Sequence, residues 1–243
     1  MRLTRSHVAM PLAVGSEVVL PEDATAHLVR VLRLQPGDAC VLFNGDGHDY
    51  EARIVAAGKR EARADVLSAR RVDNEAPLRV TLLQGIARGE KMDWILQKAT
   101  ELGVARILPV DSERSEVKLD PARAQKRLAH WREVVVAACE QSGRAVVPDV
   151  LPPQALAQAA PLREGRGLLL DPQGSASLAT LGGQAFDACT LAIGPEGGWS
   201  PRDRGQLDAA GYEGVRLGPR ILRTETAGIA AIAALQALRG DLG

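Results

Sequence analysis

Hydrophobic positions along the second two-thirds of the chain follow two alternating patterns. Short apolar runs, typical of buried strands, occupy residues 78–84, 106–110, 167–170, 191–193 and 213–217. Between them, apolar residues recur at helical spacing over 91–102, 121–142 and 154–160, and an alanine-rich helix follows residue 226. Strands that alternate with helices predict an α/β domain with a mostly parallel sheet and helices on both of its faces.

The first part of the chain has a different pattern. Predicted strands, separated by turn signals such as Asn44–Gly47, cover residues 17–20, 39–43, 49–56 and 64–67, with a helical segment opening at Pro21. Short strands with this punctuation favour a small β-barrel over a strand-helix-strand unit. The polar segment 70–76 resembles a linker, so we predict two domains, 1–72 and 73–243.

Composition restricts the function classes. The chain of 243 residues is 46% hydrophobic and 25% charged, as in soluble globular proteins, and its formal net charge is zero. A global basic field that would indicate nucleic-acid binding is therefore absent, although local clusters remain possible. The cysteines, Cys40, Cys139 and Cys189, are far apart and lack metal-ligand spacing, which predicts no metal site and a reducing compartment. No apolar run reaches membrane-spanning length, so we expect a cytoplasmic location and no membrane partner.

Two glycine-containing breaks follow predicted strands near the end of the chain. Gly194–Gly198 follows the strand at 191–193, and Gly218–Arg220 follows the strand that starts at Glu213. A tight turn between a strand and a helix would explain either break alone. Two breaks at the carboxyl ends of strands in one α/β domain are where such sheets hold ligands.

Polar residues are crowded where the last helix begins. Thr224 is a plausible N-cap, and Glu225 complements the positive end of the helix dipole. Arg223 has the wrong sign for this position, so a structural role does not explain it. Glu101 and Glu140 present the converse problem, because acidic residues near a helix carboxyl end require a compensating interaction.

The segment 27–33, HLVRVLR, carries a basic pattern. Leu28, Val31 and Leu32 have the spacing of one apolar helix face. The basic residues of the segment recur at every third position: His27, Arg30 and Arg33. This basic face is a candidate phosphate contact, and a solvated helix face is the alternative.

Several motifs together resemble one known family. They are IGPEGG at 193–198, LGPRILRTETA at 217–227, EQSGR at 140–144, KMDWILQKATELG at 91–103 and the N-terminal HLVRVLR and LFNGDG. The set is similar to the RsmE family of the SPOUT class of RNA methyltransferases, which methylates N3 of a uridine in 16S ribosomal RNA. One departure is visible, since Trp199-Ser200 and Asp203 stand where the family commonly has Phe-Ser and Glu. Both changes preserve chemical type.

The resemblance implies a fold and a cofactor. It implies a C-terminal SPOUT domain with a trefoil knot and mostly parallel sheet, a small N-terminal PUA-like β-barrel, and S-adenosylmethionine as methyl donor. It also implies a homodimer with an interface at the last helix, where Ile229, Ile232 and Leu235 share a face. The implied cofactor-binding residues are Leu169, Leu170, Asp171, Ile193, Gly194, Pro195, Glu196, Gly197, Gly198, Leu217, Gly218, Ile221 and Leu222.

The same resemblance suggests residue roles. We expect Arg223 to stabilise negative charge on the uracil O2 and O4, with Glu225 or Glu196 accepting the N3 proton or orienting the base. The expected partner is 16S ribosomal RNA or the small ribosomal subunit. The expected RNA contacts are Arg5, His27, Arg30, Arg33, Arg114 and Arg144.

Two other functions stay open at this point. A SPOUT enzyme could act on another RNA position, for instance the ribose 2'-hydroxyl of a tRNA, which requires activation of a hydroxyl. A non-catalytic RNA-binding assembly factor could hold S-adenosylmethionine, or nothing, in the loop site. Methyl transfer to a base, to a ribose or to no RNA discriminates between these alternatives.

Overall fold

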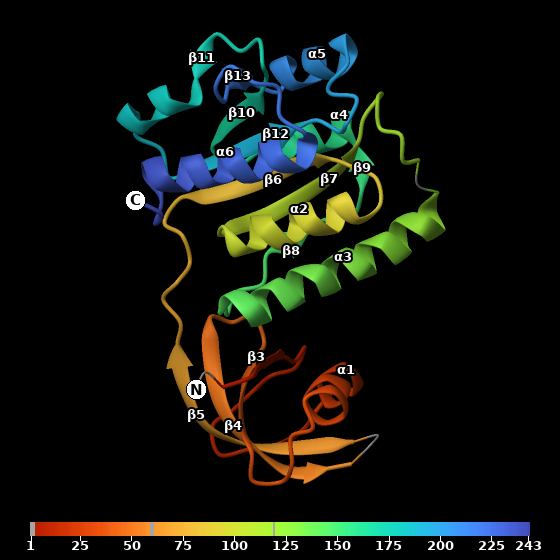
Figure 1. Ribbon diagram of the computed structural model, residues 1–243, viewed down its shortest axis with the longest axis vertical. Helices are drawn as coiled ribbons and strands as arrows, with labels where there is room; N and C mark the ends of the chain where they lie inside the picture. Colours follow the sequence, from red (N-terminus) through yellow and green to blue (C-terminus); the bar gives the residue numbers. More distant parts are fainter. Residues whose placement is uncertain (1–2, 59–60, 119) are drawn as a thin grey trace. The chain divides into compact units, whose positions relative to one another are not determined.

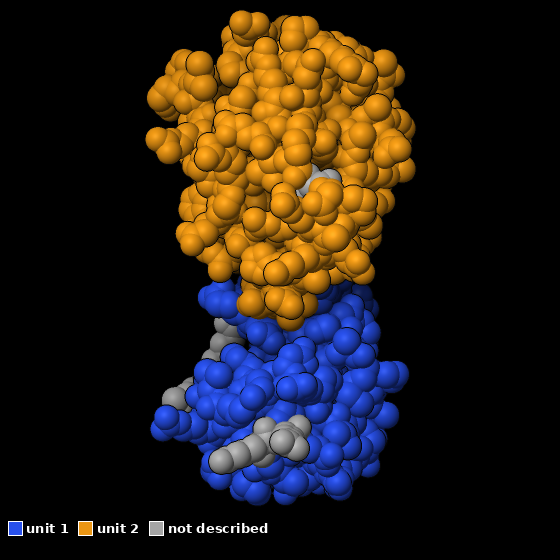
Figure 2. All heavy atoms as spheres, turned by 90° about the vertical axis from the view of Figure 1, so that its right-hand side faces the viewer, with its two compact units in different colours: residues 1–75, 139–147 blue, residues 76–138, 148–243 orange. Residues whose placement is uncertain are grey.

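The computed structural model describes residues 3–58, 61–118 and 120–243. The chain forms two compact units (Figure 2): unit 1 comprises Met1–Glu75 and Cys139–Val147, and unit 2 comprises Ala76–Ala138 and Pro148–Gly243. The boundary expected at residue 72 falls close to the end of the first segment of unit 1. The return of Cys139–Val147 to unit 1 was not predicted, because hydrophobic spacing within one helix does not reveal which core each turn joins.

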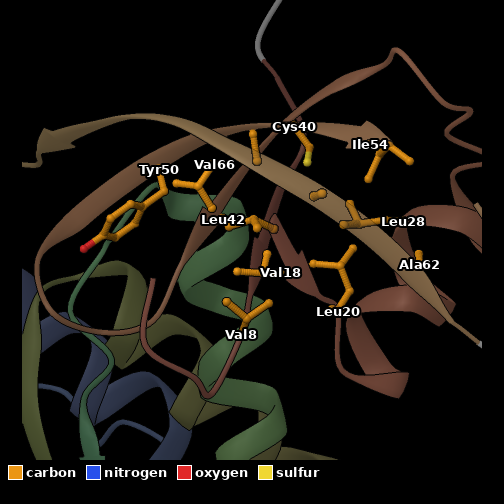
Figure 3. Close-up of a cluster of buried hydrophobic side chains, with 13 residues drawn as sticks. Val8, Val18, Leu20, Leu28, Cys40, Leu42, Tyr50, Ile54, Ala62 and Val66 are labelled. Atoms are coloured by element: carbon orange, nitrogen blue, oxygen red, sulfur yellow. The ribbon is translucent and has the colours of Figure 1, made fainter. Parts of the chain in front are cut away.

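Unit 1 is built on a five-stranded sheet with strand order β1-β3-β4-β5-β2. These strands are β1 (Arg5–His7), β2 (Glu17–Val19), β3 (Ala39–Phe43), β4 (His48–Ala57) and β5 (Ala62–Arg71). All neighbours are antiparallel except β1 and β3. Alternate residues of β4, such as Ala52 and Ile54, turn inward and meet Leu28 and Leu42 in the buried cluster of Figure 3.

The helical segment of unit 1 departs from the expected pattern. It consists of α1 (Glu22–Thr25) followed directly by a π-helical turn, η1 (Ala26–Val31). Leu28 is buried as expected, but Val31 is 68% exposed and Leu32 is 41% exposed. The prediction of one apolar face was wrong because the π turn is wider than an α turn, so residues spaced by three and four no longer align.

Arg5 is a structural residue of unit 1. Its side chain is 4% exposed, and its guanidinium donates to Asp49 Oδ1 at 2.6 Å. It also donates to the carbonyl oxygens of Cys139 at 2.8 Å and Arg144 at 3.1 Å, and it stacks over the Phe43 ring. These contacts tie the returning segment to the sheet. Both terminal nitrogens of the guanidinium thus have internal acceptors, and the RNA contact that the sequence suggested for Arg5 stays a prediction.

Arg144 has a similar role at the end of the EQSGR motif. Its side chain is also 4% exposed, and it forms an ion pair with Glu75, so the structure gives it an internal partner where an RNA contact was expected. Glu140 accepts a hydrogen bond from the His7 backbone N–H at 2.9 Å. Glu101 pairs with Lys98 at 2.8 Å, so both unfavourably placed acids have the compensating interaction that was predicted.

Unit 2 is built on a sheet whose strand pairs are all parallel, with the order β11-β13-β10-β12-β6-β7-β8 and β9 beside β7. The mostly parallel sheet is thereby confirmed. The strands are β6 (Arg79–Gly85), β7 (Val104–Asp111), β8 (Asp149–Val150), β9 (Gln154–Ala155), β10 (Arg166–Leu170), β11 (Ala176–Ser177), β12 (Ala188–Ile193) and β13 (Tyr212–Arg216).

Helices cover both faces of this sheet (Figure 1). One face carries α2 (Glu90–Glu101), α3 (Pro121–Ser142) and α6 (Thr224–Arg239). The other carries α4 (Leu156–Ala159) and α5 (Pro201–Ala209), and the short 3-10 segments are η2 (Ala160–Leu162) and η3 (Leu178–Gly183). Of the face expected at a dimer interface, Ile232 and Leu235 of α6 are fully buried within the chain, and Ile229 is half-buried.

Helix α5 was not predicted from the sequence. Its nine residues include a single core position, Leu207, which gives no periodic signal. The signal that was present is local. Ser200 accepts a hydrogen bond from the Asp203 N–H, and the Asp203 carboxylate accepts one from the Ser200 N–H, which forms a capping box.

The segment 217–223 crosses the carboxyl end of β10. β13 lies on one side of β10 and β12 on the other, and Thr224 is already hydrogen-bonded to Gly194 beyond β12. The chain that leaves β10 runs to β11 on the far side of β13 and then to η3, which packs on α6. The trefoil knot expected from the resemblance depends on this crossing.

The buried pair of Arg5 and Asp49 predicts a stability effect. Arg5→Ala leaves the Asp49 carboxylate, which is 11% exposed, without its principal partner, so we expect a loss of about 3 kcal/mol in the unfolding free energy of unit 1. Arg70→Ala is the matched control, because Arg70 also contacts Asp49, at 3.4 Å, but is 75% exposed. It should cost less than about 1 kcal/mol. Urea titration with hydrogen exchange of the β3 and β4 amides measures both, and equal losses would contradict the assignment.

Candidate active site

A cavity of about 390 Å³ opens at the carboxyl ends of β10, β12 and β13. This is the sheet edge at which the glycine-containing loops were expected to hold a ligand. Of the residues named from the resemblance, the following line the cavity: Leu170, Asp171, Ile193, Gly194, Pro195, Glu196, Gly198, Leu217, Gly218, Ile221 and Leu222. Three separate loops therefore meet at one site.

Leu169 and Gly197 do not line the cavity. Leu169 is buried in the core cluster on the α4 and α5 face of the sheet, because neighbouring residues of a strand point to opposite faces. Gly197 faces away toward Arg114, whose guanidinium donates to the Gly197 carbonyl at 3.2 Å. Arg114 thus lies beside the loop, exposed to solvent.

The loop after β12 lies very close to the end of β6. A Cβ added to Gly85 would come within 2.5 Å of the Pro195 ring and backbone nitrogen. Gly198 has φ +65°, a conformation that glycine adopts without strain. The glycines therefore permit a close backbone approach, as the sequence suggested for 194–198.

A buried hydrogen-bond network joins three elements behind the cavity. Thr224 Oγ1 donates to the Gly194 carbonyl at 2.6 Å and accepts from Gln84 Nε2 at 3.1 Å. Gln84 also donates to the Gly85 carbonyl at 2.9 Å and is fully buried. The N-cap role expected for Thr224 was wrong, because Arg223 occupies the N-cap and the Thr224 hydroxyl is used in this network.

The three candidate catalytic side chains, those of Arg223, Glu225 and Glu196, all line the cavity. The exposed Arg223 guanidinium has no hydrogen bond or ion pair within the described ranges. Glu225, in the first turn of α6, keeps one carboxylate oxygen, Oε2, buried without a partner among the described residues. Polar groups held at a cavity without internal partners can serve a ligand.

Glu196 is held differently. Its carboxylate accepts from the Arg88 backbone N–H at 3.2 Å and from Lys91 Nζ at 3.1 Å. Burial by itself raises the pKa of Glu196, but the hydrogen bonds from its own backbone N–H, from Arg88 and from Lys91 outweigh burial and hold the pKa below its usual range. An anion stabilised in this way is a weak proton acceptor, so its contacts favour a role in fixing the loop.

Asp171 is paired with Arg204 of α5. The guanidinium contacts both carboxylate oxygens, with Nη2 at 3.1 Å from Oδ1, and the Gln173 N–H donates to Oδ1 at 2.9 Å. The bond from Arg204 is the main reason that the pKa of Asp171 lies below its usual value, and it outweighs the effect of burial. This ion pair fixes the loop after β10 against α5.

Sequence reasoning missed several lining residues: Lys91, Pro172, Trp199, Arg204, Arg220, Thr224 and Ala227. Trp199 and Thr224 directly adjoin the named loops, so their adjacency in the sequence could have identified them. Lys91 and Arg204 come from α2 and α5, and only the tertiary fold brings them to the cavity. No sequence spacing could have shown this.

The remaining candidate RNA contacts lie in unit 1. Arg30 and Arg33 are exposed, and His27 is half-buried. Arg33 has φ +60°, the only positive φ of a non-glycine residue among the described residues. It ends the helical segment, so the three side chains do not form one regular helix face.

Among residues 3–58, 61–118 and 120–243, no group of three or more His, Cys, Asp and Glu side chains is placed to hold a metal ion. No helix in these ranges is both long enough and apolar enough to span a membrane.

Comparison with known proteins identifies the domains. Residues 74–236 match the family model described as an RNA methyltransferase domain, and residues 20–67 match that of an RNA methyltransferase PUA domain. A ribosomal RNA small subunit methyltransferase E from Buchnera aphidicola subsp. Schizaphis graminum is 30% identical over 243 residues, covering 99% of this chain and 98% of the relative. Its counterpart from Mycobacterium bovis is 33% identical and covers 92% of this chain and 87% of the relative.

A solved structure agrees with this match over the whole chain. The crystal structure of a ribosomal RNA small subunit methyltransferase E from Neisseria gonorrhoeae, bound to S-adenosylmethionine, is 43% identical with a TM-score of 0.95. The similarity covers 100% of both chains. The α/β fold with an N-terminal PUA domain, expected from the motifs, is confirmed.

The pair of Asp171 and Arg204 predicts a pH dependence of stability. Because the folded-state pKa of Asp171 is lowered, its ionised form stabilises the fold above the unfolded value of about 3.9, and this contribution is lost as the pH falls through the folded pKa. Asp171→Asn should cost about 1–2 kcal/mol at pH 7, and the difference from wild type should shrink between about pH 5 and pH 3.

Urea unfolding across this pH range measures the effect. In an Arg204→Ala background the same substitution should show little pH dependence, because the partner that lowers the pKa is gone. A pH-independent difference between wild type and Asp171→Asn would show that the ion pair does not stabilise the loop.

Proposed function

The chain belongs to the RNA methyltransferase family of ribosomal RNA small subunit methyltransferase E, and on this premise we propose that it methylates N3 of a uridine in 16S ribosomal RNA, with S-adenosylmethionine as methyl donor. The observation that carries the proposal is the placement of Arg223 and Glu225 on the lining of the cavity formed by the three loops. The uridine base and the cofactor would therefore lie next to the Arg223 guanidinium and Glu225 Oε2, which have no partners among the described residues.

The cavity residues fit the proposed cofactor. The volume lies in the range of small-molecule sites, and the lining combines exposed loop backbone with apolar Ile193, Leu217 and Leu222. Trp199 Nε1, like Glu225 Oε2, is a buried polar atom without a partner among the described residues. When bound, S-adenosylmethionine supplies an electrophilic methyl group on a positively charged sulfur, which carboxylates such as Glu196 and Glu225 complement.

Arg223 is suited to stabilise the nucleophile. N3 of uridine carries a weakly acidic proton, and its loss spreads negative charge over O2 and O4. A guanidinium has several donors in a planar fork and keeps its charge at neutral pH. Since Arg223 is exposed at the rim and unpaired within the described ranges, it can donate to the developing anion without first breaking an ion pair.

Glu225 is better placed than Glu196 to receive the N3 proton. Both carboxylates line the cavity, but Glu196 accepts from Arg88 and Lys91, whereas Glu225 Oε2 has no partner among the described residues. We assign proton acceptance or base orientation to Glu225 and loop positioning to Glu196. Lys91 would then act through Glu196.

The proposed partners follow from the family. The substrate is 16S ribosomal RNA, free or within the small subunit, and the proposed place of action is the cytoplasm. A homodimer is also proposed. Because Ile232 and Leu235 are buried within the chain, the interface would use half-buried Ile229 of α6 and Ile221, which is 85% exposed.

Two alternatives differ in their products. Ribose 2'-O-methylation would place the label on a sugar, and an assembly factor would bind RNA without methyl transfer. The full-length match to relatives named as small-subunit methyltransferases favours base methylation of ribosomal RNA.

The direct test uses methyl-labelled S-adenosylmethionine and small ribosomal subunits from cells that lack this enzyme. We expect label in a single nucleoside, 3-methyluridine, identified by mass spectrometry of the digested RNA. Label in a ribose would assign the chain to the 2'-O-methylating class. Cofactor binding with no label in either subunits or free RNA would favour the binding factor.

A second test concerns Arg223. Arg223→Ala should lower kcat by about 100-fold or more, because one preorganised donor to a developing anion contributes this much. Cofactor affinity, measured by calorimetry, should change less than about threefold, since the assigned role is toward the RNA base. Arg223→Lys, which keeps the charge and loses the fork, should be intermediate. Unchanged turnover in Arg223→Ala would remove the residue from the mechanism.

A further inference from the structure

Helix α3 and the loop before it border a basic hollow on unit 2. Its charged and titratable lining residues are Lys118, Arg123, Lys126, Arg127, His130 and Glu133. Lys126, Arg127 and His130 are all exposed and recur along one side of the helix at spacings of three and four. This hollow was not among the RNA contacts expected from the motifs.

The charge in this segment is unusual for the chain. Residues 118–132 contain five Lys and Arg side chains and one acidic side chain, Asp120, although the whole protein has zero formal net charge. The first turn of α3 has no acidic residue. Arg123 lies in the first turn of α3, where a cation opposes the helix dipole, and Lys126 and Arg127 follow in the next turn, so the amino-terminal part of the helix presents a concentrated positive charge.

Internal ion pairs neutralise only part of this charge: Lys118 pairs with Asp111 at 2.8 Å. Lys126 and Arg127 have no hydrogen bond or ion pair in the part of the chain that the structure describes. Arg123 pairs with Asp120 at 3.2 Å, but both side chains are more than half exposed. Such surface pairs contribute little to stability, so Arg123 remains available to an anion.

A second hollow connects the basic one to the cavity. Its lining includes Lys91, Asp93 and Trp94 of α2, Val134 of α3 and Glu225 of α6. Asp93 Oδ2 lies 2.8 Å from His130 Nε2, which joins this hollow to the basic one. Lys91 and Glu225 also line the cavity, so the second hollow adjoins the cavity through these two residues and the basic hollow through the contact of Asp93 with His130.

We propose that the basic hollow binds the phosphate backbone of the RNA substrate and directs it along α2 toward Glu225. The proposal rests on the proposed function, since an RNA must reach the cavity. Charge complementarity and continuity with the cavity favour RNA over an acidic protein segment, which would have no reason to lie on a path to the methylation site. The polar lining contains Arg side chains that can form forked bonds with phosphate.

The test compares two double variants that each remove two exposed cations. Lys126→Ala/Arg127→Ala changes the hollow, and Arg79→Ala/Arg202→Ala is the control for net charge. Arg202 is on α5, on the opposite face of the sheet, and Arg79 is at the amino end of β6, where it forms only an exposed pair with Glu164 at 3.7 Å. Affinity for protein-free small-subunit ribosomal RNA is measured at several salt concentrations. Cofactor binding and methyl transfer to small subunits are measured in parallel.

We expect the α3 variant to bind the RNA roughly tenfold more weakly at about 0.1 M salt. The slope of the logarithm of its affinity against the logarithm of the salt concentration should decrease in magnitude by about 1.5, as for two lost phosphate contacts. The control should stay within about twofold of wild type, and cofactor affinity should be unchanged in both variants. An equal loss of RNA affinity in both variants would show that only the net charge of the protein matters, and would overturn the proposal.

The remaining outcomes separate this inference from the proposed function. An α3 variant with weaker binding to assembled subunits but normal binding to protein-free RNA would indicate an acidic protein partner and overturn RNA docking. If the wild type methylates RNA but the RNA affinity of the α3 variant depends on salt as steeply as that of wild type, the docking inference is overturned and the proposed function stands. A wild type that binds RNA and cofactor without methyl transfer would overturn the proposed function, and the salt slopes would still decide the docking surface.

Discussion

The Thr224 hydroxyl is the contact on which the active site depends. It lies between the Gly194 carbonyl and the Gln84 amide, and so joins the loop after β12, the end of β6 and the start of α6. Gln84 is fully buried, which means that water cannot replace the bond that Thr224 accepts. Because Arg223 and Glu225 are the chain neighbours of Thr224, the same bond fixes their backbone at the rim of the cavity. A single side chain thus fixes the end of the segment 217–223 against the loop after β12, beside the cavity.

Arginine supplies most of the positive charge of this chain, and internal pairing divides the arginines into those bonded within the fold and those left free for a ligand. Arg5 and Arg144 are buried and bonded to acceptors within unit 1, where removing a partner would leave an uncompensated charge. Arg204 is bonded to Asp171 and fixes a loop. Arg223 and Arg127 have no such partner among the described residues, so their charge is available to a ligand. These classes look identical in the sequence, because exposure and pairing are created only by the fold.

Hydrophobic spacing predicted the alternation of strands and helices in unit 2, and glycine placement predicted two ligand-holding loops at the carboxyl edge of its sheet, because both are local signals. The third loop and the individual residues of the cavity lining were implied only by the resemblance to a known family. Sequence-based prediction was wrong or incomplete where a residue's position depends on contacts between distant segments, and where the local backbone is irregular. The π turn at Ala26–Val31 broke the expected face of Leu28 and Leu32, and α5 has too few core positions to show a period. Lys91 and Arg204 reach the cavity from helices that the sequence does not place beside it.

The EQSGR segment shows why a motif that identifies a family need not carry its chemistry. Glu140 accepts the His7 N–H, Gly143 has φ +91° at the end of α3 and accepts from Asn74, and Arg144 pairs with Glu75. Every one of these contacts lies within unit 1 and holds a discontinuous segment of chain in place, so the side chains are constrained by architecture. At the cavity the opposite holds, since the Arg223 guanidinium and Glu225 Oε2 lack partners within the described ranges. A buried polar atom that the fold does not satisfy, such as Glu225 Oε2, is costly to maintain, and a ligand that bonds to it offsets that cost.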